Sequence, residues 1–174
     1  ADSEALKIKY TNKKIYYDNE PEGVIAKKLY ATAEKIRCEK IGSNKLKGVK
    51  KNIIKCYENK FKNKKIGEIK AEGDVAIDEA FELYLRNHFF EIKQNNTTKK
   101  FLSYWKELFD KNLKKKLKEL DNSLEDQGSF NNLIAELINN LEFDDSNSKE
   151  KKETQEADKN NSVSDDNEES DNKN

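Results

Sequence analysis

The stretch that decides the fold is residues 25–53, IAKKLYATAEKIRCEKIGSNKLKGVKKNI. Its first apolar residues recur at spacings of four, four and three, which places them on one face of a helix. These residues are Ile25, Leu29, Ala33 and Ile36. Gly42 is predicted to end this helix in a left-handed conformation, and Ser43 or Asn44 is predicted to cap the next one. The stretch therefore predicts a helix, a tight turn and a second amphipathic helix that runs on through Phe61.

Three charged residues inside this stretch are the candidate functional residues of the chain: Glu34, Arg37 and Glu39. Glu34 and Arg37 are three positions apart, so their side chains can pair on one helix. Arg37 also adjoins the apolar stripe, and we expect it to bind a carboxylate from another helix, such as Glu125 or Asp126. Two interpretations stay open at this point: a brace between helices, or a contact surface for a partner subunit.

Composition indicates the class of protein. Of 174 residues, 34% are hydrophobic and 39% are charged, with one proline and six glycines, which favours long helices over a sheet rich in tight turns. From Asp144 onward eleven acidic residues outnumber five basic ones, so that segment carries a net charge of −6 and the rest carries +6. We expect one compact all-α domain of five or six helices over residues 1–143. Residues 144–174 have too few apolar side chains to offset the entropy cost of ordering, so a disordered acidic tail is predicted there.

Groups that carry catalysis or bind metals are sparse in this sequence. His88 is the only histidine, and a lone histidine makes neither a zinc site nor a catalytic triad. Cys38 and Cys56 lack a CxxC spacing and are expected to be reduced thiols. The pattern D-x-S-x-S at 144–148 follows an amphipathic helix and not a strand, so it predicts no metal site. We therefore predict no catalytic, cofactor-binding or metal-binding residue.

Lysine-rich runs at residues 45–65 and 111–118 lie near aromatic residues, a combination that can bind phosphates and stack bases. The aromatics fall at helical core positions, however, and arginine, which suits phosphate contacts better, is nearly absent. Nucleic-acid binding is therefore disfavoured. No apolar run approaches the roughly 20 residues that a membrane span needs, so we expect no membrane partner and a cytoplasmic location.

The order A-E-x-x-R-x-E-x-I-G at 33–42, followed by L-x-G-V-x-x-N at 46–52, resembles the amino-terminal region of the CobT subunit of aerobic, ATP-dependent cobaltochelatase. Four further pieces resemble the same family in the same order. They are Ala1-Asp2 with Ala5-Leu6, Pro21-Glu22-Gly23 with Ala26, L-x-x-W at 102–105, and L-E-D-Q-x-x-F at 124–130. The resemblance covers residues 1–143. Because the chain has no methionine, even at position 1, we expect it to be a fragment of a longer or engineered protein.

This resemblance implies a function. CobT and the AAA+ ATPase CobS form a chaperone-like complex, and a large subunit binds the corrin ring and cobalt. With ATP and Mg, the assembly inserts cobalt into hydrogenobyrinic acid a,c-diamide during cobalamin biosynthesis. The chain would then be the helical amino-terminal domain of CobT with the start of its acidic linker, acting in assembly and binding no cofactor itself. The alternatives are a helical nucleic-acid-binding domain and an adaptor unrelated to cobalamin.

Residues 2–10 are predicted as a short helix. Isoleucine and tyrosine alternate between residues 8 and 17, which also suits strands, and the resemblance favours the helix. Further along, leucines recur at spacings of four, three and four and predict one continuous helix. These are Leu113, Leu117, Leu120 and Leu124. The predicted core includes Leu29, Ile36 and Trp105.

Polar residues mark where the later helices begin. Asp74 is the predicted cap of one helix, and Thr97 or Thr98 that of the next. Gly128 is predicted to break the chain, and Ser129 to cap the last helix, which presents a wide apolar face up to Leu141.

Overall fold

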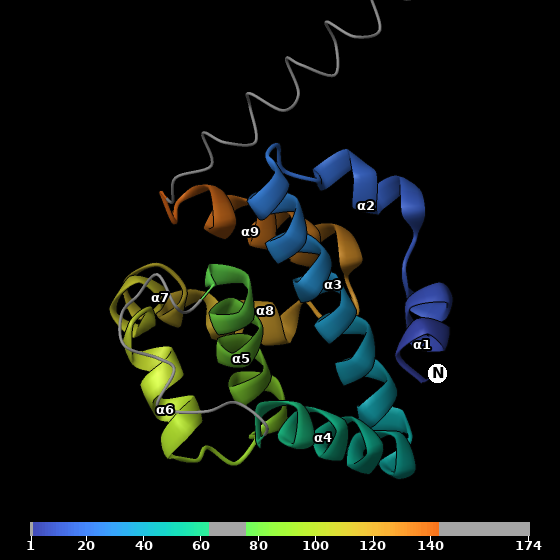
Figure 1. Ribbon diagram of the computed structural model, residues 1–174. Helices are drawn as coiled ribbons and strands as arrows, with labels where there is room; N and C mark the ends of the chain where they lie inside the picture. The colour runs from blue at the N-terminus through green and yellow to red at the C-terminus, as the bar shows by residue number, and fades with distance from the viewer. Residues whose placement is uncertain (1, 63–75, 143–174) are drawn as a thin grey trace, which may run out of the picture. The chain divides into compact units, whose positions relative to one another are not determined.

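The computed structural model describes residues 2–62 and 76–142, and every regular element in these ranges is helical (Figure 1). In chain order the elements are α1 (Asp2–Tyr10), α2 (Lys13–Asn19), α3 (Val24–Lys45), α4 (Lys47–Lys62), α5 (Ile77–Phe90), α6 (Asn96–Ser103), α7 (Lys106–Asn112), the 3-10 helix η3 (Lys114–Lys116), α8 (Leu117–Asn122) and α9 (Gln127–Asn139). The all-α prediction is confirmed, although the described ranges contain nine α-helices and not five or six. The predicted tail at 144–174 and the predicted cap Asp74 lie outside the described residues.

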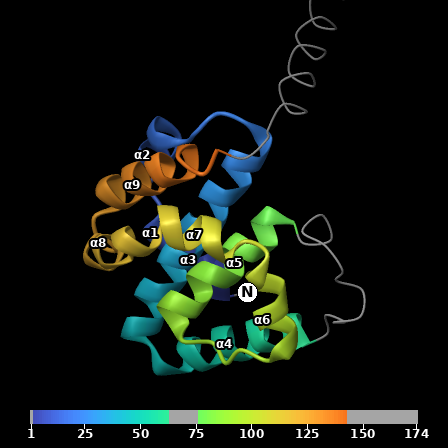
Figure 2. The same ribbon diagram turned by 90° about the vertical axis from the view of Figure 1, so that its left-hand side faces the viewer.

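Helix α3 is the centre of the fold. It packs against α1, α4, α5 and α9, while α4 lies across the lower ends of α3 and α5 (Figures 1 and 2). The predicted apolar stripe is confirmed in its middle, because Leu29, Ala33 and Ile36 expose none of their surface. Trp105, also predicted in the core, is only partly buried and stacks on Phe109 with ring centroids 6.4 Å apart.

The prediction that Gly42 ends α3 was wrong. The helix continues to Lys45, and the turn falls at Leu46, which has an extended backbone and donates its N–H to the Gly42 carbonyl at 2.9 Å. Ser43, one of the two predicted caps, is instead buried within the helix. The reason for glycine is close packing and not backbone conformation: a Cβ at position 42 would overlap the side chain of Leu6 on α1.

The first two helices settle the ambiguity between helix and strand, because residues 2–10 and 13–19 are both helical. Helix α1 packs on α3, whereas α2 packs on α9. The chain then turns into α3 through Gly23, whose φ of 103° is a backbone conformation that glycine adopts far more readily than other residues. The segment before α3 therefore has two supports, α3 for α1 and α9 for α2.

Two later helices begin two or three residues earlier than predicted. Asn95 caps α6 through a reciprocal pair of hydrogen bonds with Thr98. Thr98 is therefore the third residue of the helix, which completes this capping box, and not the cap itself. Asp126 caps α9 by accepting from the Ser129 N–H at 3.2 Å, and Gly128 lies inside the first turn. At each site a residue with a capping side chain lies N-terminal to the predicted cap, and this residue caps the helix.

The prediction of one continuous helix from the four leucines was also wrong. Helix α7 ends at Asn112, and η3 separates it from α8. Leu113 and Leu120 are fully buried, while Leu117 and Leu124 are only partly buried. Three consecutive lysines fill η3, and all three are exposed, so the chain changes direction there without placing charge in the core.

Candidate functional site

The three candidate residues on α3 all lie inside the fold. Relative exposure is 0% for Glu34, 2% for Arg37 and 0% for Glu39. Removing a charged group from water costs several kcal/mol unless it is paired and hydrogen-bonded. Each of the three must therefore have partners inside the protein, and these partners form two separate clusters.

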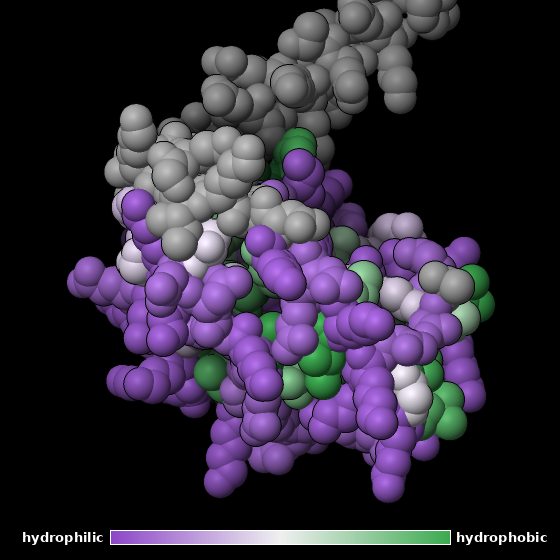
Figure 3. Space-filling model, turned by 60° about the horizontal axis from the view of Figure 1, so that its bottom comes forward, coloured by the Kyte–Doolittle hydropathy of each residue, from purple (hydrophilic) through white to green (hydrophobic). Residues whose placement is uncertain are grey.

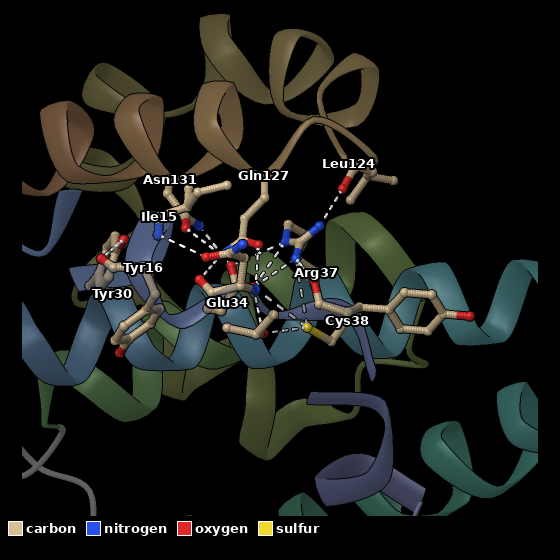
Figure 4. A network of polar contacts seen from close by, with 12 residues as sticks. Ile15, Tyr16, Tyr30, Glu34, Arg37, Cys38, Leu124, Gln127 and Asn131 are labelled. Atoms are coloured by element: carbon tan, nitrogen blue, oxygen red, sulfur yellow. Dashed lines mark hydrogen bonds and ion pairs between the residues drawn. The ribbon is translucent and has the colours of Figure 1, made fainter. Parts of the chain in front are cut away.

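The first cluster is centred on the ion pair between Arg37 and Glu34 (Figure 4). The Arg37 Nε donates to both Glu34 carboxylate oxygens at 3.1 Å, and Nη2 donates to Oε1 at 2.8 Å. The remaining donors reach backbone carbonyls: Nη2 donates to Tyr10 at 2.6 Å and Nη1 to Leu124 at 2.7 Å. One guanidinium thus ties α3 to the last residue of α1 and to the segment before α9.

The carboxylate expected to bind Arg37 from another helix was predicted wrongly. Glu125 and Asp126 are both exposed, and Asp126 caps α9 by accepting hydrogen bonds from the backbone and side chain of Ser129. Those two bonds hold the pKa of Asp126 below its usual value. Arg37 instead contacts this segment through the carbonyl of Leu124, a backbone atom that a sequence pattern does not single out.

The buried cluster also fixes the connection between α1 and α2. The Thr11 hydroxyl donates to Glu34 at 2.8 Å. Asn12 donates its N–H to the Gln127 side chain at 2.8 Å and accepts from the Gln127 amide at 3.0 Å. Asn131, on the next turn of α9, donates to Glu34 at 2.6 Å. The residues of 33–42 and of 124–130 that carry the family resemblance therefore converge on residues 10–12.

The second cluster is built on Glu39. Its carboxylate accepts from Arg86 Nη1 at 2.5 Å and from the Ser3 hydroxyl at 2.6 Å. Arg86 exposes none of its surface, and its guanidinium carbon lies 3.2 Å from the centre of the Tyr57 ring. Arg86 also donates to Glu82 at 3.1 Å. Glu39 thereby connects α3 to α1, α4 and α5.

Sequence reasoning missed Arg86, although a signal was available. The chain contains 34 basic residues, and only Arg37 and Arg86 are arginines. Arginine is used where a planar, permanently charged group with five donors must satisfy several acceptors away from water. In this fold each arginine pairs with one glutamate of α3, Glu34 or Glu39, so the rarity of arginine marked both buried ion pairs.

Cys38, a candidate nucleophile of the described ranges, is not activated. Burial raises the pKa of the Cys38 thiol to about 11, against a weaker lowering by its contact with Thr11. A thiol with a raised pKa is a poor nucleophile near neutral pH. His88 contacts Asp121 at 2.9 Å near the surface and lies outside both buried clusters. Within the described residues, no group of three or more His, Cys, Asp and Glu side chains could hold a metal ion.

Two further sequence predictions concerned the D-x-S-x-S pattern and membrane-spanning helices. The D-x-S-x-S pattern at 144–148 lies outside the described residues. Over residues 2–62 and 76–142, no helix has both the length and the apolar character needed to cross a membrane.

Comparison with known proteins identifies a matching protein family but no similar solved structure. The family model described as "Cobalamin biosynthesis protein CobT" matches residues 1–174. No solved structure matches the chain significantly. The match covers both segments that converge on residues 10–12.

Proposed function

Since this chain belongs to the CobT family of cobalamin biosynthesis proteins, we propose that its helical domain is an assembly module of the ATP-dependent cobaltochelatase. The partners would be a CobS-type AAA+ ATPase and the large corrin-binding subunit, in the cytoplasm. The complex would use ATP and Mg to insert cobalt into the corrin ring of hydrogenobyrinic acid a,c-diamide. This chain would bind none of these ligands itself and would catalyse no step; it would hold and position the other subunits.

One observation carries this proposal: the charged residues of the family motif point inward and are saturated by the protein itself. Four charged side chains are buried in the described ranges, namely Glu34, Arg37, Glu39 and Arg86. The Arg86–Glu39 pair joins α5 to α3. The Arg37–Glu34 pair lies within α3, and Arg37 reaches α1 and the segment before α9 through the carbonyls of Tyr10 and Leu124. Buried polar networks that are hydrogen-bonded favour one arrangement of helices over its alternatives. The cluster around Arg37 and Glu34 is of this kind, whereas Arg86 Nη2 in the second cluster has no hydrogen-bond partner within the described residues. A motif of this kind supports a rigid scaffold.

The alternative of nucleic-acid binding is weakened by where the aromatic side chains lie. Stacking on bases needs exposed rings beside the lysines. Tyr57 and Phe61, which accompany the lysine run at 45–65, are only 7% and 3% exposed. We therefore expect at most weak attraction of nucleic acid to surface lysines, and this attraction should disappear as salt is raised.

The test is co-purification of the full chain with the cognate ATPase, with and without ATP, ADP or a non-hydrolysable analogue. We expect a complex under at least one nucleotide condition. In parallel, retention of the chain on immobilised DNA and RNA is measured at low and at physiological salt. This measurement tests the alternative of nucleic-acid binding. Failure to bind the ATPase and the large subunit under every condition would overturn the assembly role, and salt-resistant retention on nucleic acid would favour the alternative.

A further inference from the structure

A pocket of about 600 Å³ opens where α5, α6 and α7 meet η3 and α8. Helix α6 packs on both α5 and α7, and all three helices lie on the side that faces the viewer in Figure 2. The lining includes two apolar side chains, Leu102 of α6 and Leu117 of α8. Pockets that bind small molecules enclose about 300–1,000 Å³ and combine apolar walls with a few polar groups. This pocket therefore has the size of a small-molecule site and part of the apolar lining of one.

The charge of the pocket favours an anion. Its described lining contains three lysines from three different elements, Lys99 of α6, Lys106 of α7 and Lys114 of η3. The one carboxylate in this lining belongs to Asp110 of α7. With His88 neutral, three positive charges against one negative charge leave the lining at +2. A ligand with two negative charges would balance this excess.

The three lysines of the pocket are not paired inside the protein. Hydrophilic side chains are common on the surface, as the face in Figure 3 shows, so lysine alone does not mark a site. Over residues 2–62 and 76–142, however, no carboxylate lies within 4.0 Å of the amines of Lys99, Lys106 and Lys114, whereas four other lysines have such a contact. Those four are Lys14, Lys27, Lys60 and Lys116. The fold thus gathers three unpaired positive charges around one cavity.

The other titratable groups of the lining already have partners. Tyr84 donates its hydroxyl to Asp110 at 3.1 Å, and its ring packs on Phe109 with centroids 5.3 Å apart. Burial and the contact with Asp110 raise the pKa of Tyr84, so it stays a protonated donor. His88 contacts Asp121 at 2.9 Å. The acidic group of the pocket is therefore bound to a tyrosine, and the ammonium groups remain available to a ligand.

Asn87 of α5 is an independent observation that points to a ligand. It lines the pocket, and within the described residues neither the nitrogen nor the oxygen of its side-chain amide has a hydrogen-bond partner. Buried polar groups of native proteins are nearly always hydrogen-bonded, so an orphaned amide needs an explanation. Both atoms are buried, and a rotation of the side chain would bring the amide N–H to an oxygen of a molecule in the pocket.

We propose that this pocket binds a small organic dianion, either a dicarboxylate or a phosphate monoester, whose apolar body lies against Leu102 and Leu117. The three lysines hold the anionic oxygens, and Asn87 donates to one of them. Hydrogen bonds between ionised groups are stronger than those between neutral ones, and the apolar contact adds affinity in proportion to the area that it removes from water. The inference goes beyond the proposed assembly function, and neither depends on the other.

The experiment titrates the full chain with phthalate and with phenyl phosphate and follows its amide resonances by NMR. The ionic strength is about 0.1 M, where charges more than about 10 Å apart are largely screened. We expect saturable binding of at least one probe. Lys106→Gln with Lys114→Gln should weaken it by about tenfold for each lysine. The matched control is Lys111→Gln with Lys115→Gln, which removes the same charge from the same two elements but outside the lining, and should weaken binding less than about threefold.

Two further measurements test the apolar contact and the amide. Malonate carries two carboxylates without a ring, so it should bind at least about tenfold more weakly than phthalate. Asn87→Leu keeps a similar volume and removes the orphaned amide. Replacing an unsatisfied buried polar group by an apolar one is neutral or stabilising, so the thermal melt should stay unchanged or rise while the affinity for the probe falls. A residue with only a structural role would not show this combination.

The outcomes separate a built site from diffuse attraction to surface charge. Equal weakening by the two pairs of lysine substitutions, or no saturable binding of either probe, would overturn the proposal. Malonate binding as tightly as phthalate would contradict the apolar contact. Binding of one probe alone supports the site and identifies its ligand as a carboxylate or a phosphate. None of these results depends on co-purification with the ATPase, so the failure of this site and the failure of the assembly role are distinguishable.

Discussion

Replacing Arg37 with methionine tests the central structural claim, because it removes the charge while keeping a long apolar stem. The change leaves the Glu34 carboxylate, which is 0% exposed, without its counter-ion. It also removes the donors to the carbonyls of Tyr10 and Leu124. The substitution therefore affects the ion pair within α3 and two connections of α3, to α1 and to the segment before α9.

The expected loss follows from these contacts. Breaking a buried ion pair by removing one partner costs about 3–5 kcal/mol, and each hydrogen bond to a charged donor is worth about 1.5–3 kcal/mol. These terms overlap, and Thr11 and Asn131 still donate to Glu34, so we expect a total near 5 kcal/mol. Since domains are stable by only about 5–15 kcal/mol, Arg37→Met should remove from about a third to all of the stability.

The assay is urea unfolding followed by circular dichroism, with Lys28→Met as the control. Lys28 lies on the exposed side of α3, so its replacement should change the free energy of unfolding by no more than about 0.5 kcal/mol. Adding Glu34→Gln to Arg37→Met removes the unpaired charge and should restore part of the lost stability. The reasoning would be refuted by a cost below about 1 kcal/mol for Arg37→Met, or by a double variant no more stable than the single one.

Two further predictions use internal controls. Gly42→Ala should lower the free energy of unfolding by about 1 kcal/mol or more, since the added methyl group displaces Leu6; Gly48→Ala meets open space and should be neutral or stabilising by up to about 1 kcal/mol, and equal effects at both sites would contradict the packing role. In native protein a thiol reagent should modify exposed Cys56 and spare buried Cys38. The Cys38 pKa of about 11 lies above its usual value, so its thiolate is scarce near neutral pH, and reaction should increase only as pH rises towards that pKa; equal rates at pH 7 would count against its burial.

The sequence predicted well what depends on neighbours along the chain. Spacing alone identified the buried stripe of α3 and placed Glu34 and Arg37 as a pair three positions apart. It failed where the decisive contact is distant in sequence. Burial of the Glu34–Arg37 pair depends in part on Asn131, which donates to Glu34 from 97 positions away. Helical periodicity does not predict a contact over this distance in sequence.

Gly42 shows the same limit in another form. Glycine near the end of an amphipathic run suits a helix stop, and it suits equally a close approach of another helix. Only the position of Leu6, on a separate helix, selects the second explanation. The exposure of Ile8 and Tyr17 could not be predicted from the sequence for the same reason. Ile8 and Tyr17 look like ordinary apolar helix residues until the packing of α1 and α2 shows that nothing in the described ranges covers them.

The two glutamates of α3 explain why one helix needs two buried ion pairs. Five positions separate Glu34 from Glu39, which turns their side chains about 140° apart on a helix of 3.6 residues per turn. Glu34 therefore reaches the end of α1 through Thr11, while Glu39 reaches its beginning through Ser3.

Helix α1 itself buries a single residue, Leu6, so apolar burial contributes little to holding it in place. Polar contacts from the charged residues of α3 hold it near both ends instead, at Ser3 and at Tyr10. Between these two attachments α1 exposes the side chain of Ile8. A motif that is wholly buried can in this way determine a surface it does not belong to, because it sets the position of the helix that presents that surface.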